Sequence, residues 1–192
     1  MNSVETYLSA LQKTVAELSR EDVWQVIHVL LEAWRANRQV FLLGNGGSAA
    51  TAAHFANDLN KATIVPGQHR FRAICLADNV PLLTAWANDA SYEDVFAEQL
   101  ANFLTAGDVV IAISGSGNSP NVLKAVRMAH AARAITIGFT GMLGGELKNL
   151  VDYCIAVPSG AMMQIEDVHL ALDHCISTAL RELIAKGGVM PT

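Results

Sequence analysis

The hydrophobic residues of this chain gather in five short runs, with longer stretches of helical spacing between them. Each run is almost continuously apolar, which is typical of strands that are buried on both faces of a parallel sheet. The runs lie at 39–43, 72–76, 108–113, 134–139 and 152–157. The intervening pattern predicts helices at 49–60, 80–88, 93–104, 120–132 and 146–150. Strands that alternate with helices predict an α/β fold with a doubly wound, five-stranded parallel sheet.

Two further helical segments flank the predicted sheet. The pattern of 4–35 predicts an N-terminal helical hairpin with a break near 19–22, where Ser19 is placed to cap the second helix. The last helix is expected over 162–186, and the glycine pair that follows is a suitable C-cap. Because no linker, repeat or low-complexity segment interrupts the sequence, we expect residues 1–192 to form a single domain.

Charged residues are sparse. Asp, Glu, Lys and Arg make up 16% of the 192 residues, whereas 52% are hydrophobic. So few charges suggest that part of the surface is buried against further copies of the chain. An apolar stripe along the first predicted helix fits packing either on its own domain or against a partner subunit. The stripe consists of Tyr7, Leu8, Leu11, Val15 and Leu18.

Composition also argues against several classes of protein. The net charge of −5 without a basic cluster argues against a nucleic-acid-binding face. No apolar run approaches the roughly 18 residues of a membrane span, and the polar N-terminus does not resemble a signal peptide. Three cysteines without CxxC spacing fit reduced thiols. We therefore expect a cytoplasmic protein that binds neither nucleic acid nor membrane.

Two turns rich in glycine and serine follow predicted strands. They read "GNGGS" at 44–48 and "SGSGNS" at 114–119, and each precedes a predicted helix. In an open α/β sheet, ligands bind beyond the carboxyl ends of the strands. Glycines let the backbone approach an anion closely, and the N-terminus of the following helix offers N–H groups and a partial positive charge. Both turns are therefore candidates for binding an anion.

The turns differ from the common nucleotide-binding loops, since neither the Walker pattern nor GxGxxG is present. Without a lysine, they favour a phosphate monoester that is held for recognition. The hydroxyls of Ser114, Ser116 and Ser119 are suited to surround one phosphate, with Ser48 reaching in from the other turn. The alternative, that these are only tight strand-to-helix turns, is weaker for two turns than for one.

These motifs resemble the sugar isomerase (SIS) domain. The resemblance rests on "GNGGS" with the following "HF" and on "ISGSGNSPNV", and it covers essentially the whole chain. "GNGGSAATAAHFANDL" and the late "EDVHLALDH" are most similar to the phosphoheptose isomerases. These tetrameric enzymes convert sedoheptulose 7-phosphate to D-glycero-D-manno-heptose 7-phosphate. The resemblance thus implies a homotetrameric aldose–ketose isomerase of a phosphorylated sugar that works through an enediol.

The resemblance also implies the residues that contact the substrate. In the family, the serines of the second turn hold the phosphate, and residues matching Asn45 and Asp78 lie near the sugar. Met163 stands where these enzymes carry an aspartate close to the sugar. The substrate-binding residues implied for this chain are Asn45, Gly46, Ser48, Asp78, Ser114, Gly115, Ser116, Ser119 and Glu166.

Titratable residues follow the first turn. His54 and Asp58 are four residues apart on a predicted helix and so share one face. Aldose–ketose isomerisation needs one group to move a proton between adjacent carbons and another to move a proton between the oxygens. A carboxylate and an imidazole are suited to these two tasks. The last predicted helix adds Glu166, His169 and His174, of which we interpret His169 as a structural or supporting residue.

The resemblance implies a zinc ion as well. Phosphoheptose isomerases carry His-x3-Glu on the first of these helices and Gln-x7-His on the last, and several bind zinc through all four residues. Transferred to this chain, the implied metal ligands are His54, Asp58, Glu166 and His174, and the implied catalytic residues are Asp58, His174 and Glu166. Imidazole nitrogens and carboxylate oxygens are good zinc ligands. Asp58 is one methylene shorter than the family glutamate, so either Asp58 or Glu166 is a candidate base.

Helix geometry limits this set of ligands. Residues eight apart on a helix differ in height by about 12 Å. Glu166 and His174 therefore meet one ion only if the helix begins irregularly, if the side chains bend toward each other, or if a second subunit takes part.

Other functions stay open. Non-catalytic SIS-fold proteins that bind the bacterial replication initiator also resemble these enzymes, but they lack the acidic residue that Asp58 supplies here. The presence of Asp58 and His174 therefore favours an enzyme. A sensor of sugar phosphates and an isomerase of another ketose phosphate are the remaining alternatives.

Overall fold

One parallel sheet forms the centre of the protein in the computed structural model, which describes residues 3–188. The strand order is β2–β1–β3–β4–β5, and every pairing is parallel. The strands are β1 (Gln39–Gly44), β2 (Arg72–Cys75), β3 (Val109–Ile113), β4 (Ile135–Thr140) and β5 (Tyr153–Ala156). Each predicted strand boundary lies within one residue of the observed boundary. The prediction of a doubly wound α/β fold is confirmed.

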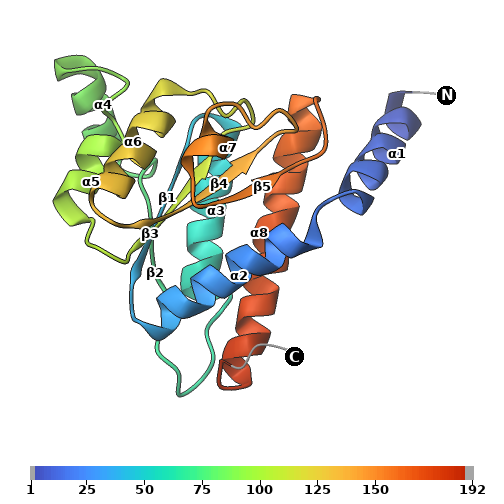
Figure 1. Ribbon diagram of the computed structural model, residues 1–192, viewed down its shortest axis with the longest axis horizontal. Helices are drawn as coiled ribbons and strands as arrows, with labels where there is room; N and C mark the ends of the chain where they lie inside the picture. Colours follow the sequence, from blue (N-terminus) through green and yellow to red (C-terminus); the bar gives the residue numbers. More distant parts are fainter. Residues whose placement is uncertain (1–2, 189–192) are drawn as a thin grey trace.

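Helices cover both faces of this sheet (Figure 1). One face carries α2 (Arg20–Arg35), α3 (Gly47–Lys61) and α8 (Met162–Ala185). The other carries α4 (Val80–Asp89), α5 (Ala97–Phe103), α6 (Pro120–Ala131) and α7 (Leu147–Leu150). Among the residues that the structure describes, no helix is both long and apolar enough to span a membrane.

Side chains of the central strands alternate between the two layers of core. Val40 and Leu42 of β1 pack with α2, α3 and α8, whereas Phe41 and Leu43 point to the opposite face. Successive side chains of a strand point to opposite faces, so a strand covered on both sides is apolar at every position. This is why continuous apolar runs located the strands.

The predicted helix at 93–104 is shorter than expected. Residues 92–96 form turns, and α5 begins only at Ala97. Val95 and Phe96 are buried in the core, while Tyr92 donates a hydrogen bond to Asn45 Oδ1 at 3.0 Å. The turns thus direct these side chains both into the core and toward the loop after β1.

The terminal helices begin and end close to their predicted positions. The first, α1 (Ser3–Ala16), is separated from α2 by a short break, and Ser19 Oγ accepts a hydrogen bond from the Asp22 amide at 3.2 Å. Beyond the sheet, α1 lies near one end of α8 (Figure 1), where the Tyr7 hydroxyl donates to Asp167. At the other end of α8, Gly188 has a φ of 80° and donates to the Leu183 carbonyl at 2.7 Å, which confirms the C-cap.

Candidate active site

The two glycine- and serine-rich turns meet at the carboxyl edge of the sheet. They follow β1 and β3, which are adjacent strands with Gly44 paired to Ile113. The strand order reverses here, because β1 lies between β2 and β3. The pocket at this edge is lined by Asn45, Gly46, Gly47, Ser48, Ile113, Ser114, Gly115, Ser116, Ser119, Met162 and Glu166. All the residues expected to contact substrate, apart from Asp78, therefore line one pocket.

Three serine hydroxyls converge in this pocket. Ser114 Oγ lies 3.3 Å from Ser119 Oγ and 3.5 Å from Ser116 Oγ. The Gly117 amide donates to Ser114 Oγ at 3.2 Å, which orients that hydroxyl. Ser119 is the N-cap residue of α6, but its side chain caps no helix amide. The cluster has hydroxyl donors at the N-terminus of a twelve-residue helix, an arrangement suited to an anion.

Glycine is required at Gly117 of the second turn. Its φ is +67°, and a Cβ there would lie 2.0 Å from the carbonyl oxygen of Gly144. The turn is thus packed directly on the loop after β4, and the Leu147 amide donates to the Gly117 carbonyl at 2.9 Å. This close packing fixes the backbone that carries the serines.

A reciprocal pair of amides joins the two turns. Asn45 Nδ2 donates to Asn121 Oδ1 and Asn121 Nδ2 donates to Asn45 Oδ1, each at 2.9 Å. Asn121 is buried, and its Oδ1 also accepts from the Val122 amide at 3.0 Å. Sequence reasoning missed Asn121, although an amide side chain directly after the proline of "GNSPN" was a visible signal. The pair holds the turn after β1 against the turn after β3.

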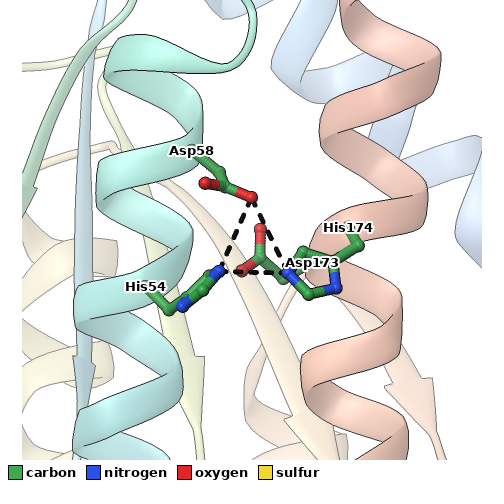
Figure 2. Close-up of side chains that lie close together, drawn as sticks. All are labelled: His54, Asp58, Asp173 and His174. Atoms are coloured by element: carbon green, nitrogen blue, oxygen red, sulfur yellow. Dashed lines mark hydrogen bonds and ion pairs between the residues drawn. The ribbon is translucent and has the colours of Figure 1, made fainter.

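A second cluster of polar side chains lies between α3 and α8 (Figure 2). His54 Nε2 is 3.0 Å from His174 Nε2, and the rings are nearly perpendicular, with 71° between their planes. Asp58 Oδ2 lies 3.8 Å from His54 Nε2 and 3.9 Å from His174 Nε2. The structure thus brings together three of the four residues that the family resemblance implied as metal ligands.

The fourth member of the cluster is Asp173, which sequence reasoning missed. One ligand atom from each of His54, Asp58, Asp173 and His174 lies within 4.8 Å of the other three. Asp173 is fully buried, and burial raises the pKa of its carboxyl to about 7, with a further rise from the charge of Asp58. The available signal was an acidic residue among the apolar positions of the last helix, four residues before Ser177.

Glu166 does not join this cluster. It lies about two turns before His174 on α8, which is helical from Met162 onward, so an irregular start does not bring the two together. A Cβ on Gly47 would lie 2.7 Å from Glu166 Oε1, so the carboxylate occupies space that only glycine leaves free. Within one chain, helix rise separates Glu166 from His174, so the expectation that they share one ion stays a prediction that requires a second subunit. Glu166 does line the serine pocket, as expected of a substrate-binding residue.

Asp78 is also placed elsewhere. It lines a separate hollow beside α3, together with Asn57, Asn60 and neighbouring residues. The reason is the strand order, since Asp78 follows the edge strand β2, which β1 separates from β3 and its serines. Asp78 thus lies outside the serine pocket of a single chain, and its contact with the substrate stays a prediction.

His169 is an internal residue. Its side chain is 1% exposed, Nε2 donates to the Thr140 carbonyl at 3.2 Å, and Nδ1 has no hydrogen-bond partner. Burial lowers the pKa of its imidazole to about 4, so the ring is neutral near pH 7. These contacts agree with a structural role on the core side of α8.

The fold and the serine pocket together define an α/β protein with a hydroxyl-lined pocket at the switch in strand order, an arrangement suited to a phosphate ester. Residues 5–141 match the SIS domain family, and the chain belongs to that family.

Two relatives and one solved structure align with most of the chain. It is 34% identical over 181 residues to the phosphoheptose isomerase of Trichlorobacter lovleyi, a match that covers 93% of this chain and 90% of the relative. It is 35% identical over 186 residues to the lincomycin biosynthesis protein LmbN of Streptomyces lincolnensis, covering 92% and 68% respectively. The solved structure of a phosphoheptose isomerase from Neisseria gonorrhoeae superposes with a TM-score of 0.87 at 29% identity, covering 93% of this chain and 97% of that one.

Proposed function

We propose that this protein is a phosphosugar isomerase that converts sedoheptulose 7-phosphate to D-glycero-D-manno-heptose 7-phosphate through an enediol. One observation carries the proposal: α3 and α8 contribute Gly47, Ser48 and Glu166 to the serine pocket, and the same two helices carry the cluster of histidines and carboxylates. The likeness to phosphoheptose isomerases over more than nine-tenths of the chain supports the choice of substrate.

The spacing of the two sites suits such a substrate. Gly47 of α3 lies beside Glu166 of α8, and seven and eight residues further along, His54 lies beside His174. The helices therefore run parallel, and the two sites are separated by about 10 Å along their axes. A seven-carbon sugar with a phosphate at one end and a carbonyl at the other spans a distance of this order.

Each group has a task in the reaction. The hydroxyls of Ser114, Ser116 and Ser119 hold the phosphate. Asp58 or Glu166 removes the proton from the carbon beside the carbonyl, and the electron pair forms the enediol double bond while the carbonyl oxygen accepts a proton. His174 moves the proton between the two oxygens, and the base returns its proton to the neighbouring carbon.

The side chains between α3 and α8 fit a zinc ion. A tetrahedral site with zinc–nitrogen distances of about 2.0–2.1 Å has edges of about 3.3 Å, and the two imidazole nitrogens lie 3.0 Å apart. We propose that His54, Asp58 and His174 hold the ion. When bound, zinc would supply a Lewis acid near the oxygens of the enediol.

The protein is proposed to act as a homotetramer in the cytoplasm. Val4, Leu8 and Val15 of α1 are exposed and share one face, and Trp24 lines the apolar groove where α1, α2 and α8 meet. A second copy of the chain would cover this surface. The substitution Leu8→Glu is expected to dissociate the assembly in sedimentation equilibrium, whereas Ser9→Glu on another face of α1 leaves it intact.

We also infer that the whole chain forms a single SIS domain. The matched segment stops at 141, but β5 pairs with β4 and α8 supplies Glu166, Asp173 and His174. The sheet and the site are therefore incomplete without the C-terminal segment.

A second candidate is an isomerase of another phosphorylated ketose. The likeness to a lincomycin biosynthesis protein supports it, as does Met163, which is 73% exposed and lies outside the residues that line the serine pocket. The reaction and its catalytic groups would be the same, and only the contacts to the sugar would differ.

The test is incubation of the purified protein with sedoheptulose 7-phosphate, with added zinc or with a chelator, while aldose formation is followed. Turnover with zinc supports the proposal, and turnover only with another ketose phosphate supports the second candidate. Absence of turnover under all conditions, with binding of the sugar phosphate intact, would instead indicate a non-catalytic binding module.

A further inference from the structure

Asp173 is an unusual residue to find on the buried face of a helix. It is 0% exposed, and its neighbours on this face of α8, His169, Leu172 and Ile176, are buried as well. Asp173 Oδ1 accepts a hydrogen bond from the Ser177 hydroxyl at 3.2 Å, but Oδ2 has no hydrogen-bond partner. A buried carboxylate oxygen without a partner is costly in free energy. A ligand bound to Asp173 Oδ2 would offset this cost.

The surroundings of Asp173 identify the ligand as a cation. Figure 2 shows its carboxylate between α3 and α8, directed toward the side chains of His54, Asp58 and His174. One atom of each residue lies within 4.8 Å of the others, and Asp58 brings a second carboxylate. Two carboxylates and two imidazole nitrogens around one point match the ligands that a divalent metal such as zinc prefers.

We infer that Asp173 is the fourth metal ligand of this protein, at the coordination position that the family resemblance gives to Glu166. The inference rests on the proposed function, since the same ion is involved. Each helix then contributes two ligands: His54 and Asp58 from adjacent turns of α3, and the adjacent residues Asp173 and His174 from α8. Four protein ligands are the number found in a tetrahedral zinc site, and for the proposed Lewis-acid role a substrate oxygen would have to join them as a fifth ligand.

Ser177 completes this arrangement as a positioning residue. Its hydroxyl is buried one turn after Asp173 and donates to Oδ1, which leaves Oδ2 free to face the ion. Outer hydrogen bonds of this kind orient metal-binding carboxylates.

The inference also changes the role of Glu166. As a residue outside the coordination shell, it keeps its carboxylate in the serine pocket beside Gly47, where it faces the substrate. Substitution of Asp173 should therefore weaken metal binding, whereas substitution of Glu166 should leave it unchanged, and the two form a matched pair for the experiment.

The experiment measures zinc binding to the full-length, metal-free protein by competition with a chromophoric chelator, and thermal unfolding with and without zinc. The wild type and Glu166→Gln are expected to bind one zinc ion with dissociation constants within about 3-fold of each other. Asp173→Asn is expected to bind zinc at least about 10-fold more weakly. Even the removal of an outer hydrogen-bond partner of a metal ligand lowers metal affinity by about 10-fold or more. Without zinc, Asp173→Asn should melt at a higher temperature than the wild type, because the costly charge is gone, and zinc should raise its melting temperature less.

Asp173→Ala serves as the second variant, because an asparagine oxygen retains some capacity to coordinate. Far-UV circular dichroism and gel filtration verify that both variants are folded. Wild-type affinity in both Asp173 variants, or an equal loss in Glu166→Gln, would overturn the inference and leave the isomerase proposal standing. If the wild type binds no zinc, the inference also fails, and turnover in the presence of chelator then decides the proposed function separately.

Discussion

His54 of α3 and His174 of α8 face each other with 3.0 Å between their Nε2 atoms. A hydrogen bond between two imidazoles requires one Nε2 to carry the hydrogen and the other to accept it. The pair therefore requires one ring to carry its hydrogen on Nε2 and the other to leave Nε2 unprotonated. The same two nitrogens point toward Asp58 Oδ2, so one small region can either hold an ion or pass a proton.

The two histidines should differ in their effect on turnover. His174→Ala removes the group proposed to move the proton between the oxygens, so kcat should fall by about 10²–10⁴-fold even with saturating zinc. His54→Ala keeps that imidazole and should lose mainly zinc affinity, with kcat partly restored at high zinc concentration. Steady-state kinetics across a zinc titration checks this difference, and equal, zinc-independent losses in both variants would contradict it.

The serine pocket should control binding of the substrate. Ser119→Ala removes a hydroxyl from the cluster without removing a helix cap, because the side chain makes no capping hydrogen bond. A hydrogen bond to a charged group is worth about 1.5–3 kcal/mol, so KM for the phosphosugar should rise about 10–100-fold while the stability of the fold stays the same. Inhibition by inorganic phosphate should weaken in parallel. Ser9→Ala, which alters an exposed serine of α1, provides a control with unchanged KM.

Much of the fold was predictable because buried strands require a recognisable pattern of apolar residues in the sequence. A strand covered on both faces, such as β1 or β3, needs apolar side chains at every position, and glycine-rich turns marked the carboxyl ends of both. The segment before α5 was not predictable in this way. Its residues have a helical pattern, but Val95 and Phe96 meet core partners that are distant in sequence, and these contacts favour turns.

The site was predictable only in part, because it depends on individual residues and not on a repeated sequence pattern. His54, Asp58 and His174 were expected together, and the structure brings them together. Asp173 was missed because it occupies a helix position where an apolar residue is expected, and only tertiary contacts show what it faces. The family resemblance implied Glu166 as a ligand beside His174, and the rise along a regular helix, already considered from the sequence, separates the two within one chain.

The Asn45–Asn121 pair should be needed for the pocket to keep its shape. Asn121→Ala removes both 2.9 Å hydrogen bonds of the pair and leaves Asn45 Nδ2 without its acceptor, while Asn45 Oδ1 keeps the hydrogen bond from Tyr92. The free energy of unfolding should fall by about 1–3 kcal/mol, and KM should rise because the two turns are no longer held together. Urea unfolding and kinetics test both effects. Asn102→Ala, an exposed asparagine on α5, should change neither quantity.

Two buried residues should give the metal-free protein opposing pH dependences. The pKa of His169 is lowered to about 4, so the unfolded chain binds its proton more readily between pH 6.5 and 4, and stability falls as pH falls through that window. The shift corresponds to a loss of about 3 kcal/mol. The pKa of Asp173 is raised to about 7, so its protonation in the folded state adds stability as pH falls below 7.

These two effects offset each other in the wild type, and Asp173→Asn should reveal the contribution of His169. Urea unfolding between pH 7 and 4 should show a steeper loss of stability in Asp173→Asn than in the metal-free wild type. Adding His169→Gln to Asp173→Asn should flatten the curve again, since the amide keeps a donor for the Thr140 carbonyl but does not titrate. Parallel curves for the wild type and Asp173→Asn would show that Asp173 is charged in the folded protein.

The identity of the base can be decided by comparing the two carboxylates that are candidates for this role. Asp58 lies beside both imidazoles, whereas Glu166 lies beside Gly47 in the serine pocket. If Glu166 removes the carbon-bound proton, Glu166→Gln should lower kcat by about 10²–10⁴-fold without weakening zinc binding. If Asp58 does so, Asp58→Asn should cause the same loss at saturating zinc. Exchange of the substrate's carbon-bound hydrogen with deuterium oxide isolates this step, because a variant that lacks the base forms no enediol and incorporates no deuterium. Exchange that persists in Glu166→Gln and disappears in Asp58→Asn would assign the base to Asp58, and the converse result would assign it to Glu166.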